Sequence, residues 1–212
     1  MPKDWRDWHQ HYDNPSSSIS LRLELVQNAL RRALADAPND EHGVVNLITM
    51  CAGEGRDVLP VLVNENSRPV KATLVEYDET LAERARTAVQ NLQLSDVEVK
   101  TADAGTPDTY RDLPLAQILT VCSVFGNIPV EDMRRTVATL PALLADDGIV
   151  IWTRAGRNQS LEVRNVFLDH GFTEMSFTNT TDDMFWVGMH RLAGKPAQPH
   201  APQPGTRMFS FF

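Results

Sequence analysis

The sequence predicts an α/β protein with a mostly parallel sheet and helices on both faces. Short apolar runs alternate with segments of helical periodicity through the middle of the chain, which is typical of parallel strands joined by helical crossovers. The apolar run at residues 44–50 stops abruptly at Gly53-Glu54-Gly55, and the next two runs end at Glu76 and Asp103. Because the carboxyl ends of parallel strands meet at one edge of a sheet, these run ends predict a ligand site there.

A helix over residues 19–35 is predicted ahead of the alternating region. Pro15 and the three serines at 16–18 provide a break and a cap for its first turn. Its apolar stripe has helical spacing and consists of Leu23, Val26, Leu30 and Leu34.

The alternating region then predicts seven strands and four helices. The strands are expected at residues 44–50, 72–76, 97–101, 118–124, 149–153, 173–178 and 185–191. The helices are expected at residues 57–64, 79–92, 131–144 and 160–170. We expect Gly148 to break the chain before the fifth strand and Gly171 to close the last helix.

Composition narrows the class of protein. The chain has 212 residues, a formal net charge of −8 and 42% hydrophobic residues, which fits a globular protein with a sizeable core. No Lys/Arg block is present to neutralise phosphates, so a broad nucleic-acid surface is not expected. No apolar run approaches the roughly 20 residues of a membrane span, and the polar start MPKDWRDWHQ does not resemble a secretory signal, so a cytoplasmic location is expected. The two cysteines are expected to be thiols, and no cluster has metal-ligand spacing.

Three parts are expected along the chain. Residues 1–43 would form an N-terminal helical cap or lid, residues 44–193 the ligand-binding domain, and residues 194–212 a Pro-rich linker with an apolar tail. The tail reads Met208-Phe209-Ser210-Phe211-Phe212. Three phenylalanines in five residues predict docking on the body of the protein, with a strand as one form that the docked segment could take.

The glycine turn and the two acids describe a nucleoside pocket. Gly53 and Gly55 allow the backbone to approach a ligand at the start of a helix. Glu76 can accept hydrogen bonds from ribose hydroxyls, and Asp103 can accept one from an exocyclic amine such as adenine N6. A dinucleotide fingerprint would need a third small residue where this chain has Val58, and acidic residues at the turn would repel a pyrophosphate. They suit a ligand with a cationic portion, as S-adenosylmethionine has.

At these positions the sequence resembles the class I S-adenosylmethionine-dependent methyltransferases, over roughly residues 44–191. CAGEGRD resembles the first motif of the family, Glu76-Tyr77-Asp78 its acidic second strand end, and Ala102-Asp103-Ala104 its adenine-contacting motif. The resemblance implies a Rossmann-like, seven-stranded, mostly parallel sheet of order 3-2-1-4-5-7-6 with the last strand antiparallel. It also implies S-adenosylmethionine as cofactor, S-adenosylhomocysteine as product, and cofactor contacts from Cys51, Ala52, Gly53, Glu54, Gly55, Asp57, Glu76, Tyr77, Asp103, Ala104 and Ser123.

Two departures from the family pattern bear on the chemistry. Thr49 and Cys51 stand where the family often has an acid and a glycine, so the early charged contact would come from Asp57, Glu54 or a backbone carbonyl. No Asn-Pro-Pro-Tyr or Asp-Pro-Pro-Tyr motif follows the fourth strand, which disfavours methylation of a planar amide or base amine in that style.

Candidate substrate-binding residues lie at the N-terminus and near the ends of strands four and five. They are Trp8, His11, Tyr12, Phe125, Asn127 and Arg154. The sequence identifies no catalytic base; His11 and Tyr12 would qualify only if the N-terminal segment folds over the site. The acidic chain favours a small-molecule acceptor, methylated on oxygen or nitrogen.

Two other functions are compatible with the sequence. One is a nicotinamide-dependent oxidoreductase, which is disfavoured by Val58 and by the acidic residues at the turn. The other is a methyltransferase-like protein that binds a ligand or partner without turnover. The sequence indicates neither the acceptor nor the oligomeric state.

Overall fold

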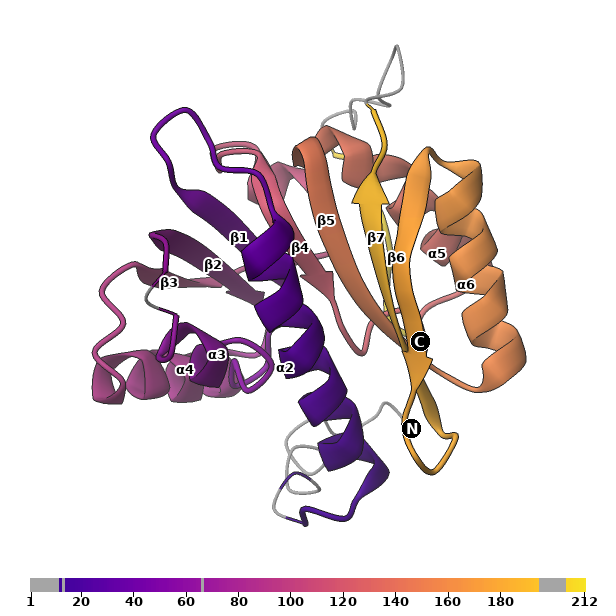
Figure 1. Cartoon of the computed structure of the whole chain (residues 1–212), viewed down its shortest axis with the longest axis horizontal. Coiled ribbons are helices and arrows are strands. Elements are labelled where there is room, and N and C mark those ends of the chain that lie inside the picture. Colours follow the sequence, from indigo (N-terminus) through magenta and orange to yellow (C-terminus); the bar gives the residue numbers. More distant parts are fainter. Residues whose placement is uncertain (1–11, 13, 66, 195–204) are drawn as a thin grey trace.

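The computed structural model describes residues 12, 14–65, 67–194 and 205–212. Its centre is a seven-stranded sheet in the order β3-β2-β1-β4-β5-β7-β6 (Figure 1). The strands are β1 Val45–Met50, β2 Val70–Glu76, β3 Val97–Thr101, β4 Ala116–Val121, β5 Leu144–Ala155, β6 Phe172–Asn179 and β7 Phe185–Leu192. β7 pairs antiparallel with both β5 and β6, and the other pairs are parallel. The predicted fold class and strand order are therefore confirmed.

Helices cover both faces of the sheet. They are α2 Ser18–Asp36, α3 Leu59–Leu62, α4 Glu79–Asn91, α5 Val130–Thr139 and α6 Arg157–Asp169, with 3-10 turns at Pro107–Tyr110 and Leu140–Ala142. α2 crosses one face of the sheet (Figure 1) and begins at Ser17, whose hydroxyl accepts a hydrogen bond from the Ser20 amide at 3.1 Å. None of the helices in the described ranges has the length and apolarity that a bilayer crossing needs.

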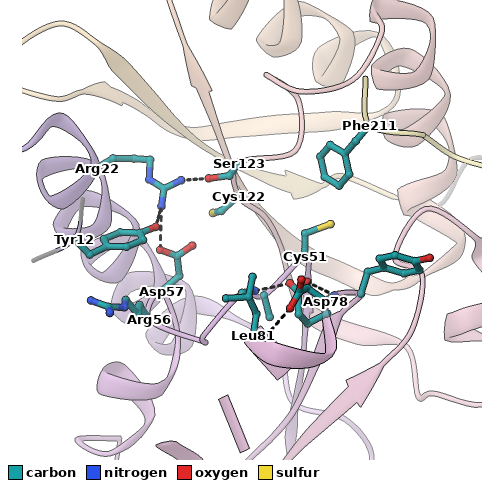
Figure 2. Close-up of a pocket in the computed structure, with 14 residues that line it drawn as sticks. Tyr12, Arg22, Cys51, Arg56, Asp57, Asp78, Leu81, Cys122, Ser123 and Phe211 are labelled. Atoms are coloured by element: carbon teal, nitrogen blue, oxygen red, sulfur yellow. Dashed lines mark hydrogen bonds and ion pairs between the residues drawn. The ribbon is translucent and has the colours of Figure 1, made fainter. Parts of the chain in front are cut away.

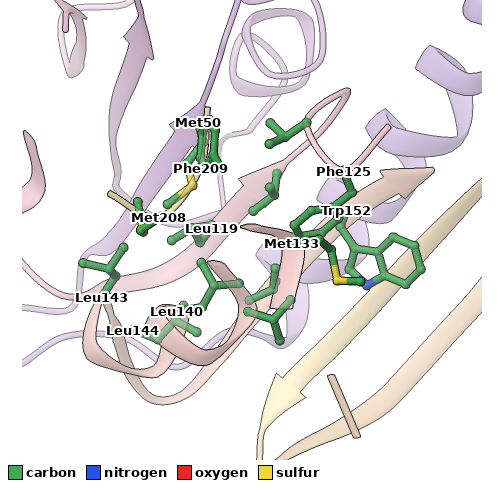
Figure 3. Packing of buried hydrophobic residues seen from close by; sticks show 14 of the residues in the cluster. Met50, Leu119, Phe125, Met133, Leu140, Leu143, Leu144, Trp152, Met208 and Phe209 are labelled. Carbon is green, nitrogen blue, oxygen red and sulfur yellow. The ribbon is translucent and has the colours of Figure 1, made fainter. Parts of the chain in front are cut away.

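Two hydrophobic clusters fill the two sides of the sheet. The first joins α2 and α3 to side chains of β1, β2, β5 and β7. The second joins α5, α6 and two residues of the last segment, Met208 and Phe209, to the other side (Figure 3). β1 and β4 are buried along their whole length, as expected for central strands covered on both faces.

The last described segment, residues 205–212, packs against the body of the protein, and no strand is assigned to it. Met208 is 1% exposed and Phe209 is 2% exposed. Figure 3 shows both beside Met50 and Leu119, in the second cluster. Burial of these two side chains is enough to fix the segment on the body of the protein.

Two predicted boundaries around Gly148 were wrong. β5 begins at Leu144 and runs through Gly148, which we expected to break the chain. A Cβ on Gly148 would lie 2.9 Å from the Ala145 carbonyl oxygen and 3.0 Å from that of Ala116, so the glycine allows close strand contact. The preceding helix ends at Thr139 and continues as a 3-10 turn containing Pro141, because proline cannot continue the α-helical bonding pattern.

His190 of β7 is held in the core as a neutral ring. It is 0% exposed, and Trp152 Nε1 donates a hydrogen bond to its Nδ1 at 3.1 Å. Its ring stacks at 4.9 Å from that of Phe167. Burial is the largest cause that lowers the pKa of His190 to about 4.

We predict that His190 destabilises the fold at acid pH. The unfolded chain binds the proton with a pKa near 6.5, so the contribution of neutral His190 is present above about pH 6.5 and is lost as the pH falls towards 4. The shift corresponds to a loss of roughly 3 kcal/mol in the free energy of unfolding. Urea unfolding of wild type and His190→Gln between pH 7 and pH 4 measures it. Parallel pH profiles for the two proteins would contradict the prediction.

Candidate functional site

A pocket lies at the carboxyl ends of β1, β2 and β4, where the strand order reverses (Figure 2). This is the position at which open α/β sheets bind their ligands. The predicted site residues that line it are Tyr12, Cys51, Ala52, Gly53, Asp57, Glu76, Tyr77 and Ser123. Residues without such a prediction also line it, namely Arg22, Arg56, Asp78, Leu81, Cys122 and Phe211.

The two glycines of the turn have different tasks. Both have left-handed backbone, with φ of +56° at Gly53 and +76° at Gly55. A Cβ on Gly55 would lie 2.8 Å from Leu59 and 2.9 Å from Leu74, so Gly55 permits packing of the turn on the core. Gly53 lines the pocket and donates its amide to Glu76. Only Gly53 is therefore placed to let the backbone approach a ligand.

Glu76 is fixed by backbone amides at the end of β2. Its Oε2 accepts from the Gly53 amide at 2.7 Å and its Oε1 from the Asp78 amide at 2.8 Å. The side chain is buried, and burial is the largest cause that raises its pKa, against the opposing effect of these amides. A carboxylate oxygen can accept more than one hydrogen bond, so these amides leave acceptor capacity for a pair of ribose hydroxyls.

A buried arginine, Arg22, lines the pocket on the side away from Asp78 (Figure 2). The Arg22 guanidinium is 1% exposed and lies 3.6 Å from Asp57. It donates hydrogen bonds to the Ser123 hydroxyl and the Tyr12 phenol (Figure 2). Arg22 therefore brings together three predicted site residues from three parts of the chain. A fixed guanidinium is also a good partner for a ligand carboxylate.

Sequence reasoning missed Arg22, although a signal was present. Residue 22 lies four positions before Val26 and so extends the buried face of α2, where a charged residue is out of place. An arginine on the apolar stripe of a helix that reaches a ligand site indicates a functional role.

Tyr12 is the one candidate substrate-binding residue of the N-terminal segment that lies within the described residues. Its ring lies under two guanidinium groups, at 5.8 Å from Arg22 and 5.2 Å from Arg56. Burial is the largest cause that raises its pKa, so the phenol is protonated at neutral pH. It can position a group by hydrogen bonding but is poorly suited to act as a base. Trp8 and His11 lie outside the described residues.

Other predicted residues lie near the pocket but are engaged elsewhere. Glu54 bonds Arg56 at 2.7 Å and Arg84 at 2.9 Å. Asp103 accepts from the Gly105 amide at 2.8 Å and pairs with Arg207 at 2.8 Å. Neither Glu54 nor Asp103 is among the residues that line the pocket.

The remaining candidates support the walls. Ala104 is buried and its carbonyl accepts from the Tyr110 hydroxyl at 2.9 Å. Phe125 packs edge-on against Trp152 in the core, at 6.2 Å between ring centroids. The Asn127 side chain donates to the Ser123 carbonyl at 2.7 Å, and Arg154 donates to the Ala155 carbonyl at 2.9 Å. As placed, Phe125 is a core residue and the other two brace loops beside the site.

The two cysteines are thiols, of which Cys122 is buried and Cys51 is half-buried. Cys51 and Cys122 are both free, and burial raises the pKa of each well above its usual value. Both line the pocket as small, neutral side chains. Among the described residues, no group of three or more His, Cys, Asp or Glu side chains is placed to hold a metal ion.

The comparisons with known proteins agree with this geometry. A family model, Methyltransf_20, described as "Putative methyltransferase", matches residues 16–171. The chain belongs to this family. The resemblance to class I methyltransferases is thereby confirmed, and the family match gives no support to an oxidoreductase. No curated protein matches the chain by sequence.

Solved structures share the fold at low identity. An O-methyltransferase family protein from Burkholderia thailandensis is 11% identical with a TM-score of 0.67, covering 84% of this chain and 58% of its own. Magnesium protoporphyrin IX methyltransferase from Synechocystis PCC 6803, solved with bound SAH, is 14% identical with a TM-score of 0.64, covering 88% and 93%. Aeropyrum pernix fibrillarin, in complex with S-adenosyl-L-methionine, is 14% identical with a TM-score of 0.58, covering 76% and 74%.

We predict that Gly55→Ala destabilises the methyltransferase more than Gly43→Ala does. Both positions have positive φ, +76° and +79°, so both variants suffer backbone strain of about 1–2 kcal/mol. Only the new Cβ at position 55 meets neighbours within 4 Å, which adds roughly 1–3 kcal/mol of overpacking. Chemical denaturation of both variants measures the difference. Equal losses would show that the turn relaxes around the extra methyl group.

Proposed function

We propose that the protein transfers a methyl group from S-adenosylmethionine to a small-molecule acceptor, on oxygen or nitrogen. The observation that carries the proposal is that the pocket is lined by a fixed carboxylate, Glu76, and by a buried guanidinium, Arg22. Glu76, fixed by two backbone amides, suits the ribose hydroxyls of the cofactor, and Arg22 suits the carboxylate of its methionine part. One ligand that carries both groups, with a cationic centre between them, is S-adenosylmethionine.

The chain's own residues would act mainly by positioning. When bound, S-adenosylmethionine supplies an electrophilic methyl group on its sulfonium. Glu76 would hold one end of the cofactor and Arg22 the other. The protonated Tyr12 phenol and the Ser123 hydroxyl, both bonded to Arg22, offer polar contacts beside it. Holding the partners in line and excluding water supplies much of the acceleration in such a displacement.

The class of acceptor, the N-terminal lid and the cellular location are proposed from the sequence and from the residues around the pocket. The net charge of −8 supports a small metabolite over a nucleic acid as acceptor. The place of Tyr12 in the pocket wall supports an N-terminal lid over residues 1–43, ahead of a cofactor-binding domain at residues 44–193. A cytoplasmic location stays a prediction from composition.

The decisive experiment is calorimetric titration with S-adenosylmethionine, S-adenosylhomocysteine, NAD and NADP, each alone. Binding of the first two and not of the others is expected. Turnover with a panel of small hydroxyl and amine acceptors then separates an enzyme from a non-catalytic binding protein. If the protein binds S-adenosylhomocysteine but methylates no member of a broad panel, the result would favour a non-catalytic binding protein.

Glu76→Ala should weaken S-adenosylhomocysteine binding by about 1.5–3 kcal/mol, the usual worth of a hydrogen bond to a charged acceptor. Glu76→Gln keeps an acceptor oxygen and should lose less. Calorimetry on the two variants gives the comparison, with the thermal transition as a check on folding. If both variants bind with wild-type affinity, Glu76 does not contact the cofactor.

Arg22→Gln should weaken S-adenosylhomocysteine far more than adenosine, because only the former carries a carboxylate. A loss of about ten- to a hundredfold for S-adenosylhomocysteine is expected from a charge-assisted pair. The substitution also leaves Asp57 without its Arg22 partner, which could disturb the pocket in general. The ratio of the affinities for S-adenosylhomocysteine and adenosine corrects for that disturbance, because it affects both ligands. Arg22→Lys keeps the charge and should recover part of the ratio. An unchanged ratio in Arg22→Gln would remove Arg22 from the carboxylate site.

A further inference from the structure

The segment 205–212 bridges two loops at the carboxyl edge of the sheet. The Met208 amide donates to the Gly105 carbonyl, in the loop after β3, at 2.7 Å. The Phe212 amide donates to the Asn127 carbonyl, in the loop after β4, at 3.2 Å. Between them the Ser210 amide donates to Asp132 at 2.9 Å. The segment is therefore held at backbone atoms on both sides of the pocket's rim.

The loop after β3 is shaped to receive this segment. A Cβ on Gly105 would lie 2.3 Å from the Phe209 carbonyl oxygen, so only glycine allows the segment to approach. Asp103, two residues earlier, pairs with Arg207 at 2.8 Å. Met208 and Phe209 are almost fully buried beneath these contacts. Asp103 of the predicted adenine-contacting motif and Gly105, which directly follows the motif, thus hold residues 207–209.

This anchoring places Phe211 in the wall of the pocket. Figure 2 shows its ring on the side of the pocket opposite Asp57 and Tyr12, above Cys51. Phe211 is 40% exposed and Tyr77, which also lines the pocket, is 76% exposed. Tyr77 directly follows Glu76, the predicted ribose contact. Phe211 follows residues that are held by Asp103, the predicted adenine contact, and by Gly105. Both aromatic side chains therefore lie on the nucleoside side of the pocket.

Exposed aromatic faces beside a nucleoside site have a direct use. A purine base presents a π-face that stacks on aromatic rings, and the contact removes apolar surface of both partners from water. Phe209 supports Phe211 edge-on, at 5.7 Å between ring centroids. The Phe211 ring is therefore braced by a buried neighbour while part of its surface faces the pocket.

We propose that segment 205–212 forms part of the cofactor site and that Phe211 contacts the base of an adenosyl ligand. The proposal rests on the proposed function, because it assumes that the pocket takes S-adenosylmethionine. Asp103 then acts on the base indirectly, as a positioning residue that holds Arg207 and the segment, together with Gly105.

The test compares Phe211→Ala with Phe212→Ala. Phe212 is the adjacent residue of the same type and is 80% exposed, without a place in the pocket wall. Phe211→Ala should weaken adenosine and S-adenosylhomocysteine alike, by about tenfold, as for loss of one base–aromatic stack. Phe212→Ala should change both by less than twofold. Phe211→Trp, which keeps an aromatic face, should retain most of the affinity.

A second variant tests the anchoring separately. Gly105→Ala should displace the segment and weaken both ligands at least as much as Phe211→Ala does. Adding Phe211→Ala to Gly105→Ala should then cost little more, because the two changes remove the same contact. Losses that multiply in the double variant would overturn the assigned role of Gly105.

The outcomes distinguish this inference from the function on which it rests. A wild-type protein that binds neither adenosine nor S-adenosylhomocysteine would overturn both. A wild-type protein that binds them, with Phe211→Ala equally tight by calorimetry and a normal thermal transition, would overturn only the role of Phe211.

Discussion

The bond between the Glu76 carboxylate and the Gly53 amide joins the ends of two neighbouring parallel strands. Parallel pairing brings β1 and β2 to the same edge, but it does not fix the turn that follows β1. The Glu76 carboxylate helps to fix the turn, because one of its oxygens accepts from the Gly53 amide and the other accepts from the amide of Asp78, the N-cap residue of α4. Together with the backbone bonds of the turn, this side chain sets the shape of the pocket floor.

The cost of that arrangement is visible in the burial of charge. Glu76 and Arg22 are both largely removed from water, which is unfavourable for isolated ions. Backbone amides compensate the carboxylate, whereas Tyr12, Ser123 and Asp57 compensate the guanidinium. Charges buried on opposite sides of one pocket do little for stability and much for recognition, since their orientation is fixed before a ligand arrives.

The strand ends that form the floor of the pocket could be predicted from local signals, whereas the order of the strands was an implication of the resemblance to the methyltransferase family. The break at Gly53, and acidic residues closing successive apolar runs, sit close together in sequence and report one sheet edge. Arg22 and Phe211 could not be placed in the same way. Their roles arise from packing of a helix and a chain segment that are separated from the turn by tens of residues. Asp103 illustrates the converse case, because its partner Arg207 lies far along the chain and no local pattern indicates the ion pair.

The boundary between α5 and β5 shows another limit of prediction from the sequence. Gly148 reads as a chain break by its type, yet the neighbouring strand edge needs a residue without a side chain at that point. Glycine has two uses in strands, to turn the backbone and to let another backbone come close, and the sequence alone does not separate them.

The wall of the pocket contains residues as far apart in the sequence as Tyr12 and Phe211. During synthesis the sheet edge with Gly53, Glu76 and Ser123 can form while later residues are still inside the ribosome. The wall that holds Phe211 is added only when the segment after β7 has emerged and docked on Gly105. Until this segment has docked, a newly made chain therefore has an open nucleoside site.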